Sequence, residues 1–580
     1  MLLLPLSLLV SAFFGVASAS PIQVPLVAPH DASEESLQRI DTGLKGRFLH
    51  LTDMHPDMYY KPDAAESTAC HRRKPKKEKE RGGYYGLPYG DCDSPFTLTN
   101  FTLDFLEKHW ANEIDFVVWT GDSARHDNDR EVPRTPDEIY ELNRAAARRM
   151  NEIFTSRGIP VVPTLGNNDV WPHNIMAAGP NSITNEFSSI WMNFIPFESF
   201  QVFQRGGYYS VEVVPDEVAV ISLNTMYFYD SNKAVGGCEY GEGDDPGNLQ
   251  FDWFEVQLDR FRERGMQVWV SGHVPPSPGN YFPGCFVRYA DLALRYQDTI
   301  LGHLFGHMNV DHFFFLEPED TVLPEESSAK HLEEKIGERS HSSLAETLFT
   351  DFSTLPRKGK TDLDEYVIIN VGPSVVPNPY VPTFRVYAYN ATGGSSDQPG
   401  EALPEPDSDL KKKKKKGGKG KKRKHGHRHP GRETNVDCKK KENRGTWACR
   451  PRKPQYASDD SPSRRNTLWT PLGYAQYWLP NLDEASKDAK PKFKLEYTTM
   501  SASNARRAFP PKQLPKSLRG AGREGEGEAE VKKKKGRKYT PYKLDDLTIG
   551  SYLGLGRRLG DEKEEGVRAL FRRYMYQNTE

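Results

Sequence analysis

Few cysteines, no Cys-x-x-Cys pair and no glycine-rich phosphate loop occur in this 580-residue sequence. The missing cysteine pair excludes finger-type thiolate zinc sites, and the missing loop removes the usual signature of nucleotide-phosphate binding. There is no heptad repeat, which excludes a coiled coil. Beyond residue 19 no apolar run is long enough to span a membrane. The rest of the chain is therefore expected on one side of any membrane.

The N-terminus is the exception to this polar character. Met1–Ala19 is apolar and ends in Ala17-Ser-Ala19, a small-residue pattern typical of a cleaved secretory signal. An uncleaved signal anchor is the alternative, although Pro5 and three serines make the run marginal for spanning. Residues 20–46 are expected to be a lead-in without regular structure.

The six cysteines form an even set, which favours disulfides in an oxidising compartment. Pairing of neighbours is the simplest hypothesis (Cys70 with Cys92, Cys238 with Cys285, Cys438 with Cys449), although sequence alone does not fix connectivity. Asn100 and Asn390 begin Asn-x-Thr sequons, so both are candidate glycosylation sites.

Short apolar runs alternate with helical patterns from Arg47 onward, which predicts an α/β fold. Thr135-Pro136 starts a helix that Gly158 should stop, and a second helix should end at Gly265. An antiparallel hairpin is expected where Pro215-Asp216-Glu217 joins two apolar runs. The expected strands are Phe48–Leu51, Ile114–Trp119, Ile159–Leu165, Tyr208–Val214, Val218–Leu223, Val268–Val270 and Ile300–Phe305.

Other segments interrupt this pattern. Residues 71–81 are a basic insertion, and residues 318–345 are a polar excursion. Residues 394–467 are basic and of low complexity, and 503–580 is expected to be basic and largely disordered. Between them, residues 468–502 are rich enough in aromatic side chains to pack back on the main body.

Polar side chains follow five of the expected strands directly. The carboxyl ends of parallel strands meet at one edge of a sheet, where open α/β sheets bind ligands. Oxygen and imidazole ligands without thiolate suit divalent ions such as Mg²⁺, Mn²⁺, Co²⁺ or Zn²⁺. Each motif alone is weak, but the ordered set predicts one metal centre. The motifs are Asp53-x-His55, Gly121-Asp122 with His126, Gly166-Asn167-Asn168-Asp169, Gly272-His273 and Gly306-His307-x-Asn309.

This series resembles the calcineurin-like metallophosphoesterases and is closest to their acid-sphingomyelinase-like branch. Within that branch it is similar to the fungal endopolyphosphatases, on the runs at 166–174 and 305–309 and the lysine-rich insertions. The resemblance covers residues 47–393, the expected metallophosphoesterase domain. It implies two packed mixed β-sheets flanked by helices, with disordered basic insertions. It also implies two divalent ions: Asp53 and His55 on the first, Asp122 bridging, and Asn167, His273 and His307 on the second.

Two positions depart from the family pattern. Asn309 stands where the family has a histidine; it would be a weaker ligand, with His303 and His312 as nearby substitutes. Asn168 replaces a histidine assigned to leaving-group protonation. Since acid catalysis contributes roughly 10²–10⁴-fold, its loss favours a phosphate leaving group, and hence anhydride cleavage. His126 would contact the substrate phosphate or supply the proton, and a packing role for this side chain also stays open.

The implied activity is internal hydrolysis of long-chain inorganic polyphosphate by dinuclear-metal in-line displacement. Arg72, Arg73, Lys74, Lys76 and Lys77 are tentative substrate contacts, because cations beside the site would attract a polyanion. The lysine runs at 411–424 and 532–538 would do the same or be solvated tails. Alternatives are a sphingomyelinase-like or nucleotide phosphodiesterase and a non-catalytic polyanion-binding protein. The resemblance also implies a vacuolar location, in the lumen or as a single-pass membrane protein. No nucleic-acid partner is expected.

Overall fold

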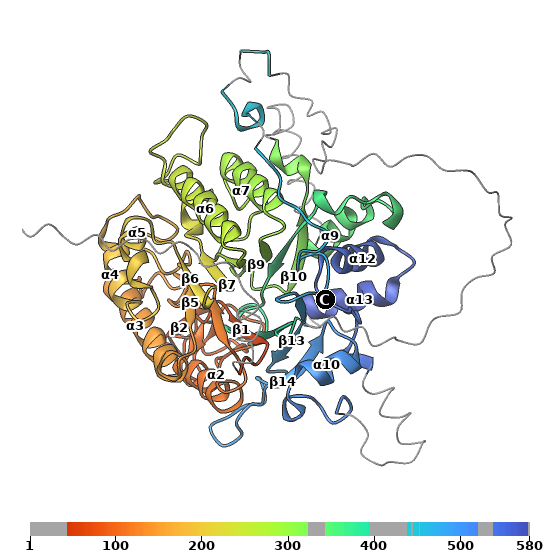
Figure 1. Ribbon diagram of the computed structural model, residues 1–580. Helices are drawn as coiled ribbons and strands as arrows, with labels where there is room; N and C mark the ends of the chain where they lie inside the picture. Colours follow the sequence, from red (N-terminus) through yellow and green to blue (C-terminus); the bar gives the residue numbers. More distant parts are fainter. Residues whose placement is uncertain are drawn as a thin grey trace, which may run out of the picture. The chain divides into compact units, whose positions relative to one another are not determined.

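A computed structural model describes residues 43–322, 343–393, 438–441, 445–451, 453–519 and 537–577 (Figure 1). The predicted signal or anchor and the lysine run at 411–424 lie outside these ranges. The described elements belong to one unit that begins at Leu44. No helix within the described ranges is both long and apolar enough to cross a membrane.

Two six-stranded mixed sheets form the centre of this unit. The first has the order β14-β13-β12-β1-β4-β5, with β1, β4 and β5 parallel to one another. Its strands are β1 (Arg47–Leu51), β4 (Phe116–Trp119), β5 (Val161–Pro163), β12 (Thr383–Tyr389), β13 (Pro471–Trp478) and β14 (Lys494–Thr498). The second has the order β10-β11-β9-β8-β7-β6. Its strands are β6 (Tyr209–Val214), β7 (Val218–Ser222), β8 (Gln267–Ser271), β9 (Ile300–Phe305), β10 (His312–Leu316) and β11 (Val367–Val371).

The two sheets pack against each other through aromatic side chains. The ring of Phe48 on β1 lies 4.9 Å from that of Trp269 on β8, and Tyr387 on β12 also contacts Trp269. These residues belong to one continuous buried core. The predicted strands and the β6–β7 hairpin are confirmed with ends shifted by a few residues, as is the fold class of two packed mixed sheets with flanking helices.

Helices cover the sheets where their apolar faces predict them. In α3 (Pro136–Ile153) the Thr135 side chain accepts a hydrogen bond from the backbone of Glu138, and the apolar side chains of one face are buried. The helix ends at Ile153, before a turn that closes at Gly158. α6 (Pro246–Glu263) is capped by Asp245 and packs beside α7 (Pro283–Arg295). The other longer helices are α2 (Phe96–His109), α4 (Ser182–Ile190) and α5 (Phe200–Gly206).

The C-terminal part corrects the sequence prediction. The described residues of this part, 503–519 and 537–577, contain most of α10 (Ala502–Ala508) and all of α12 (Ile549–Gly560) and α13 (Glu565–Tyr576), and α12 and α13 pack with α9 (Leu344–Ser353). Leu553 and Leu559 are fully buried, so this end belongs to the core. Residues 453–467 also pack on the body, with Ser461 and Ser463 buried. The sequence prediction relied on the basic charge of the flanking segments and did not take account of the apolar spacing within these helices. Residues 468–502 supply β13 and β14.

The three disulfides join neighbouring cysteines, which confirms the simplest pairing. Of the two sequons, Asn100 is exposed on α2. Asn390 is only 7% exposed, and its amide nitrogen donates to Asn466 at 2.9 Å. Asn390 is thus buried in the folded chain, and glycosylation at this residue stays a prediction.

Candidate metal centre

The loops after β1, β4, β5, β8 and β9 bring the predicted ligands to one place. His273 Nε2 lies 3.2 Å from Asp122 Oδ2 and 2.9 Å from Asn167 Oδ1. His55 Nε2 lies 3.5 Å from carboxylate oxygens of both Asp53 and Asp122. Asp122 therefore stands between two groups of ligands, as a bridging residue would.

The other two predicted ligands come from the loop after β9. His307 Nδ1 lies 2.9 Å from Asn167 Oδ1, and its backbone N–H donates to Asp53 Oδ2 at 3.0 Å. Asn309 donates its amide N–H to the carbonyl of Asn378 at 2.9 Å, which leaves Oδ1 free to accept or ligate. All seven predicted metal residues thus belong to this part of the fold.

The backbone is strained at this site. Five of the seven residues have left-handed φ values, between 39° and 71°: Asp53, His55, Asp122, His307 and Asn309. Such values are uncommon outside glycine and cluster at functional sites. Gly166 and Gly306 are needed for close approach, since a Cβ at these positions would overlap Asp122 and Thr52 respectively.

Neighbouring groups fix the orientation of the imidazoles. His55 Nδ1 donates to the carbonyl of Ala124 at 2.7 Å, and His273 Nδ1 donates to the carbonyl of Thr120 at 2.7 Å. Each ring therefore presents Nε2 to the centre, the arrangement usual for metal-binding histidines.

The pKa values of the histidines reflect the negative charge of the neighbouring carboxylates. Burial opposes a charge on His273, but Asp122 and Asp53 outweigh it and raise its pKa to about 9. Burial and the carboxylates of Asp53 and Asp122 act on His55 in the same way, with a pKa of about 9. His307 differs, because burial and His273 lower its pKa to about 4. The carboxylates of Asp53 and Asp122 thus favour positive charge at this place, which a divalent ion would supply.

These residues fit a pair of divalent ions. Among the described side chains, three buried atoms of this group have no hydrogen-bond partner, namely Asp53 Oδ1, His55 Nε2 and Asn309 Oδ1. Unpaired buried polar atoms are costly and call for a ligand. Asp53, Asp122 and His273 also offer ligand atoms within 4.8 Å of one another.

The suggested substitutes for Asn309 do not reach the centre. His303 is buried in the core and hydrogen-bonds the hydroxyl of Tyr289 at 2.6 Å. His312 lies on β10, where its Nδ1 pairs with the carbonyl of Val310. Asn309 remains the candidate ligand from this loop.

Asn168 contacts the predicted bridging residue directly. It is 2% exposed, and both its backbone N–H and its side-chain amide donate to Asp122 at 2.8 Å. Asn168 thus positions the bridging carboxylate, and its catalytic assignment stays a prediction.

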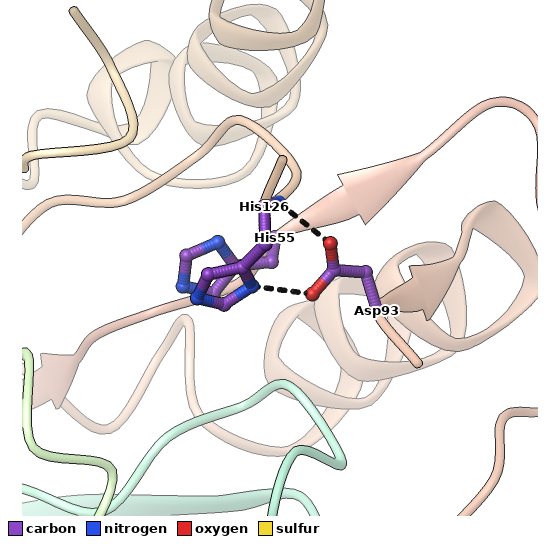
Figure 2. Close-up of side chains that lie close together, drawn as sticks. All are labelled: His55, Asp93 and His126. Carbon is purple, nitrogen blue, oxygen red and sulfur yellow. Dashed lines mark hydrogen bonds and ion pairs between the residues drawn. The ribbon is translucent and has the colours of Figure 1, made fainter. Parts of the chain in front are cut away.

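His126 is held by a carboxylate that sequence reasoning missed. Asp93 accepts hydrogen bonds from the backbone N–H and from Nδ1 of His126, both at 2.6 Å (Figure 2). The His126 ring also stacks on His55, with ring centroids 3.9 Å apart. His126 is 23% exposed at its side chain, and only its Nε2 is left to meet a substrate.

Asp169 and Asn174 also escaped prediction. Asp169 Oδ2 accepts the backbone N–H groups of Asp122 and Gly166 at 2.9 Å and so ties two ligand loops together. Asn174 accepts from the amide of Asn167 at 3.0 Å and turns Asn167 Oδ1 toward the centre. Asp169 belongs to the Gly166–Asp169 motif, but the spacing of that motif does not show that Asp169 joins two loops.

The basic insertion is tied down at its start. Arg72 forms a two-point ion pair with Asp129, at 2.6 and 2.9 Å, and is therefore occupied instead of free for substrate. His71 is buried and lies between Asp57 and Asp129, at 2.8 and 2.7 Å. The remaining predicted contacts (Arg73, Lys74, Lys76 and Lys77) are exposed on the surface.

Comparison with known proteins agrees with this geometry. Residues 46–311 match the family model described as calcineurin-like phosphoesterase. A Cryptococcus neoformans protein named endopolyphosphatase is 41% identical over 650 aligned positions, covering 94% of each chain. One from Schizosaccharomyces pombe is 39% identical over 60% of this chain and 62% of its own. A solved dimetal phosphatase from Danio rerio is 10% identical, covering 59% of this chain and 92% of its own, with a TM-score of 0.31.

Proposed function

The chain belongs to the endopolyphosphatase family of calcineurin-like phosphoesterases, and on that premise we propose that it hydrolyses internal phosphoanhydride bonds of long-chain inorganic polyphosphate. The observation that carries the proposal is the convergence of Asp53, Asp122, Asn167 and His273 on one buried centre. The phosphodiesterase and non-catalytic alternatives are less well supported, because the family relatives bear the endopolyphosphatase name and the Asp53, Asp122, Asn167 and His273 side chains come together at one centre.

Asp53, His55, Asp122 and Asn309 would hold one divalent ion, and Asp122, Asn167, His273 and His307 the other. Such a pair, when bound, supplies an activated water and stabilises negative charge on the phosphoryl oxygens. Mg²⁺, Mn²⁺, Co²⁺ and Zn²⁺ all suit these ligands.

The chain's own residues place the substrate and its charges. His126, fixed by Asp93, presents Nε2 beside His55 and is positioned to meet a phosphate oxygen of the substrate. Asn168 holds Asp122 and has no proton to donate at useful pH. Anhydride cleavage tolerates this arrangement, because the leaving group is a phosphate and not an alkoxide.

We also propose a cellular compartment for this protein. The N-terminal sequence, the disulfides and the exposed Asn100 sequon support entry into the secretory pathway, with glycosylation at Asn100. We place the catalytic unit in the vacuole, in the lumen or held at the membrane by an uncleaved N-terminal anchor. Immunolocalisation of the tagged full chain, with and without residues 1–19, tests this placement.

The direct test of function is incubation of the purified protein with long-chain polyphosphate and a divalent ion, followed by gel electrophoresis. Internal cleavage predicts a rapid fall in chain length with little free phosphate, and a chelator should abolish it. Release of phosphate from otherwise full-length chains would instead indicate terminal cleavage. An unchanged ladder would refute the proposal.

A further inference from the structure

Three cationic side chains from separate segments line one pocket at the edge of the first sheet. Lys494 comes from β14, Lys538 from the short helix η10 (Arg537–Tyr539) and Arg573 from α13. The pocket has a volume of about 250 Å³. These cations are 44 and 35 residues apart along the chain (538 − 494 and 573 − 538), so the fold and not a local run gathers them.

The charges of this pocket are not neutralised within the described part of the chain. All three cations are exposed, and no carboxylate of the described residues forms an ion pair with any of them. Lys494 Nζ has only a weak contact with Asn481 Oδ1 at 3.4 Å, and Lys538 Nζ lies 4.7 Å from the centre of the Tyr539 ring. Like charges gathered in this way repel one another unless an anion joins them.

Glu496 is the one carboxyl group among the residues that line this pocket. It is 7% exposed and accepts a hydrogen bond from Gln476 at 2.9 Å. Burial raises the pKa of Glu496 to about 8, although Gln476, Arg385 and Arg573 act to lower that pKa, so the carboxyl group is protonated in acidic solution. It therefore does not repel an anion in the pocket.

Strand register places the pocket at the same ends of the strands as the metal centre. His50 on β1 pairs with Arg385 on β12, which pairs with Gln476 on β13. Both pairings are antiparallel, so β13 runs in the direction of β1. Asp53, just beyond the end of β1, and Trp478, the last residue of β13, therefore lie at the same ends of their strands.

Trp478 in turn pairs with Lys494 on β14. Neighbouring strands are about 4.8 Å apart, so the three steps from β1 to β14 cover roughly 15 Å across the sheet. A flexible polyanion held at the centre spans such a distance.

We propose that Lys494, Lys538 and Arg573 form a second phosphate-chain site, which holds a distant part of the polyphosphate while another part lies at the metal centre. The inference rests on the proposed function. A polyanion has a charge at every phosphate, so cations at three points match it without needing a particular end group. Holding the chain away from the centre would favour cuts within it over removal of terminal phosphates.

The test measures binding of long-chain polyphosphate in an Asp122→Asn background, at several salt concentrations. The triple change Lys494→Ala, Lys538→Ala and Arg573→Ala should weaken binding about tenfold, as three solvent-facing ion pairs would. It should also lower the slope of log affinity against log salt by about 2, since each phosphate contact on a single strand contributes roughly 0.7. The triple change Lys487→Ala, Lys490→Ala and Lys492→Ala is the matched control, because it also removes three charges and these exposed lysines lie in the β13–β14 loop and do not line the pocket.

Orthophosphate serves as the second probe. If the triple variant loses orthophosphate binding but keeps its affinity for long chains, the pocket binds product and the chain-holding inference is wrong. Equal losses in the triple variant and the lysine control would also overturn it, because they would show a non-specific charge effect. Circular dichroism checks that both variants fold. Failure of the proposed function is distinguishable, since the chain with unaltered sequence would then leave long polyphosphate uncut.

Discussion

The pair formed by Asp93 and His126 leads to a prediction about a buried carboxylate outside the ligand set. In Asp93→Asn, the amide oxygen still accepts one of the two N–H groups of His126. The amide NH₂ group faces the other N–H group and cannot accept it. The variant loses a charge-assisted hydrogen bond of 2.6 Å, and such bonds contribute about 1.5–3 kcal/mol. Because that bond fixes the His126 ring, we expect polyphosphate hydrolysis to fall roughly 10- to 100-fold.

The assay is the initial rate of chain shortening at saturating divalent ion. Asp91→Asn is the matched control, since Asp91 is exposed, lies two residues away and carries the same charge. The control should keep its rate within about twofold, as surface changes usually do. Equal losses in both variants would show that charge in the loop, and not the contact with His126, is responsible.

A double-mutant cycle separates positioning from a general effect on folding. If Asp93 acts through His126, then Asp93→Asn combined with His126→Gln should be no slower than His126→Gln alone. If the rate loss of the double variant equalled the product of the two single losses, the reasoning would be refuted, because Asp93 would then act independently of the ring it contacts.

Other predictions follow from the same contacts. Asp122→Asn should reduce hydrolysis at least ~10³-fold while the thermal midpoint moves by only a few degrees; near-normal turnover would exclude a bridging role. Asn309→His should tighten metal binding by about tenfold in calorimetry, because imidazole is a stronger ligand than an amide, and unchanged affinity would place Asn309 outside the centre. His71→Gln should lower the free energy of unfolding by about 2 kcal/mol at pH 5. Burial opposes a charge on His71, but Asp57 and Asp129 raise its pKa above 6.5, and Arg72 and the Tyr59 ring are its other neighbours. This contribution is complete below 6.5 and is lost as pH rises through the raised pKa, so urea titrations should show a smaller difference at pH 9; a constant difference would contradict it.

The ligand series was predictable because its signals are local. Each apolar run ends in a small set of polar residues, and parallel strands bring such ends together. Local sequence signals also predicted the α3 cap and the β6–β7 hairpin. Local spacing therefore identified the strand-end motifs, and the family resemblance assigned the seven candidate metal residues within them.

The residues that support the centre were not predictable in this way. Asp93 lies 33 positions before His126 and has no motif around it. The neighbouring Cys70–Cys92 disulfide and the short β2–β3 pairing (Pro56–Asp57 with Ser94–Pro95) bring its segment to the site. Burial of Asn390 depends likewise on a contact with Asn466, which a three-residue sequon does not contain.

The C-terminal helices were missed for a different reason. Tyr552, Leu555 and Leu559 follow a helical spacing of three and four residues that is visible in the sequence. The neighbouring lysine run made the whole segment look like a solvated tail. Charge composition, averaged over residues 503–580, concealed a short amphipathic pattern that packs on α9.

The most direct test of the metal centre is the number of divalent ions bound per chain. Titration of the chelator-treated protein with Mn²⁺, followed by calorimetry and metal analysis, should give two sites in the unaltered chain and fewer than two in Asp122→Asn. A single site in the unaltered chain, or a stoichiometry that Asp122→Asn leaves unchanged, would contradict a dinuclear centre bridged by Asp122.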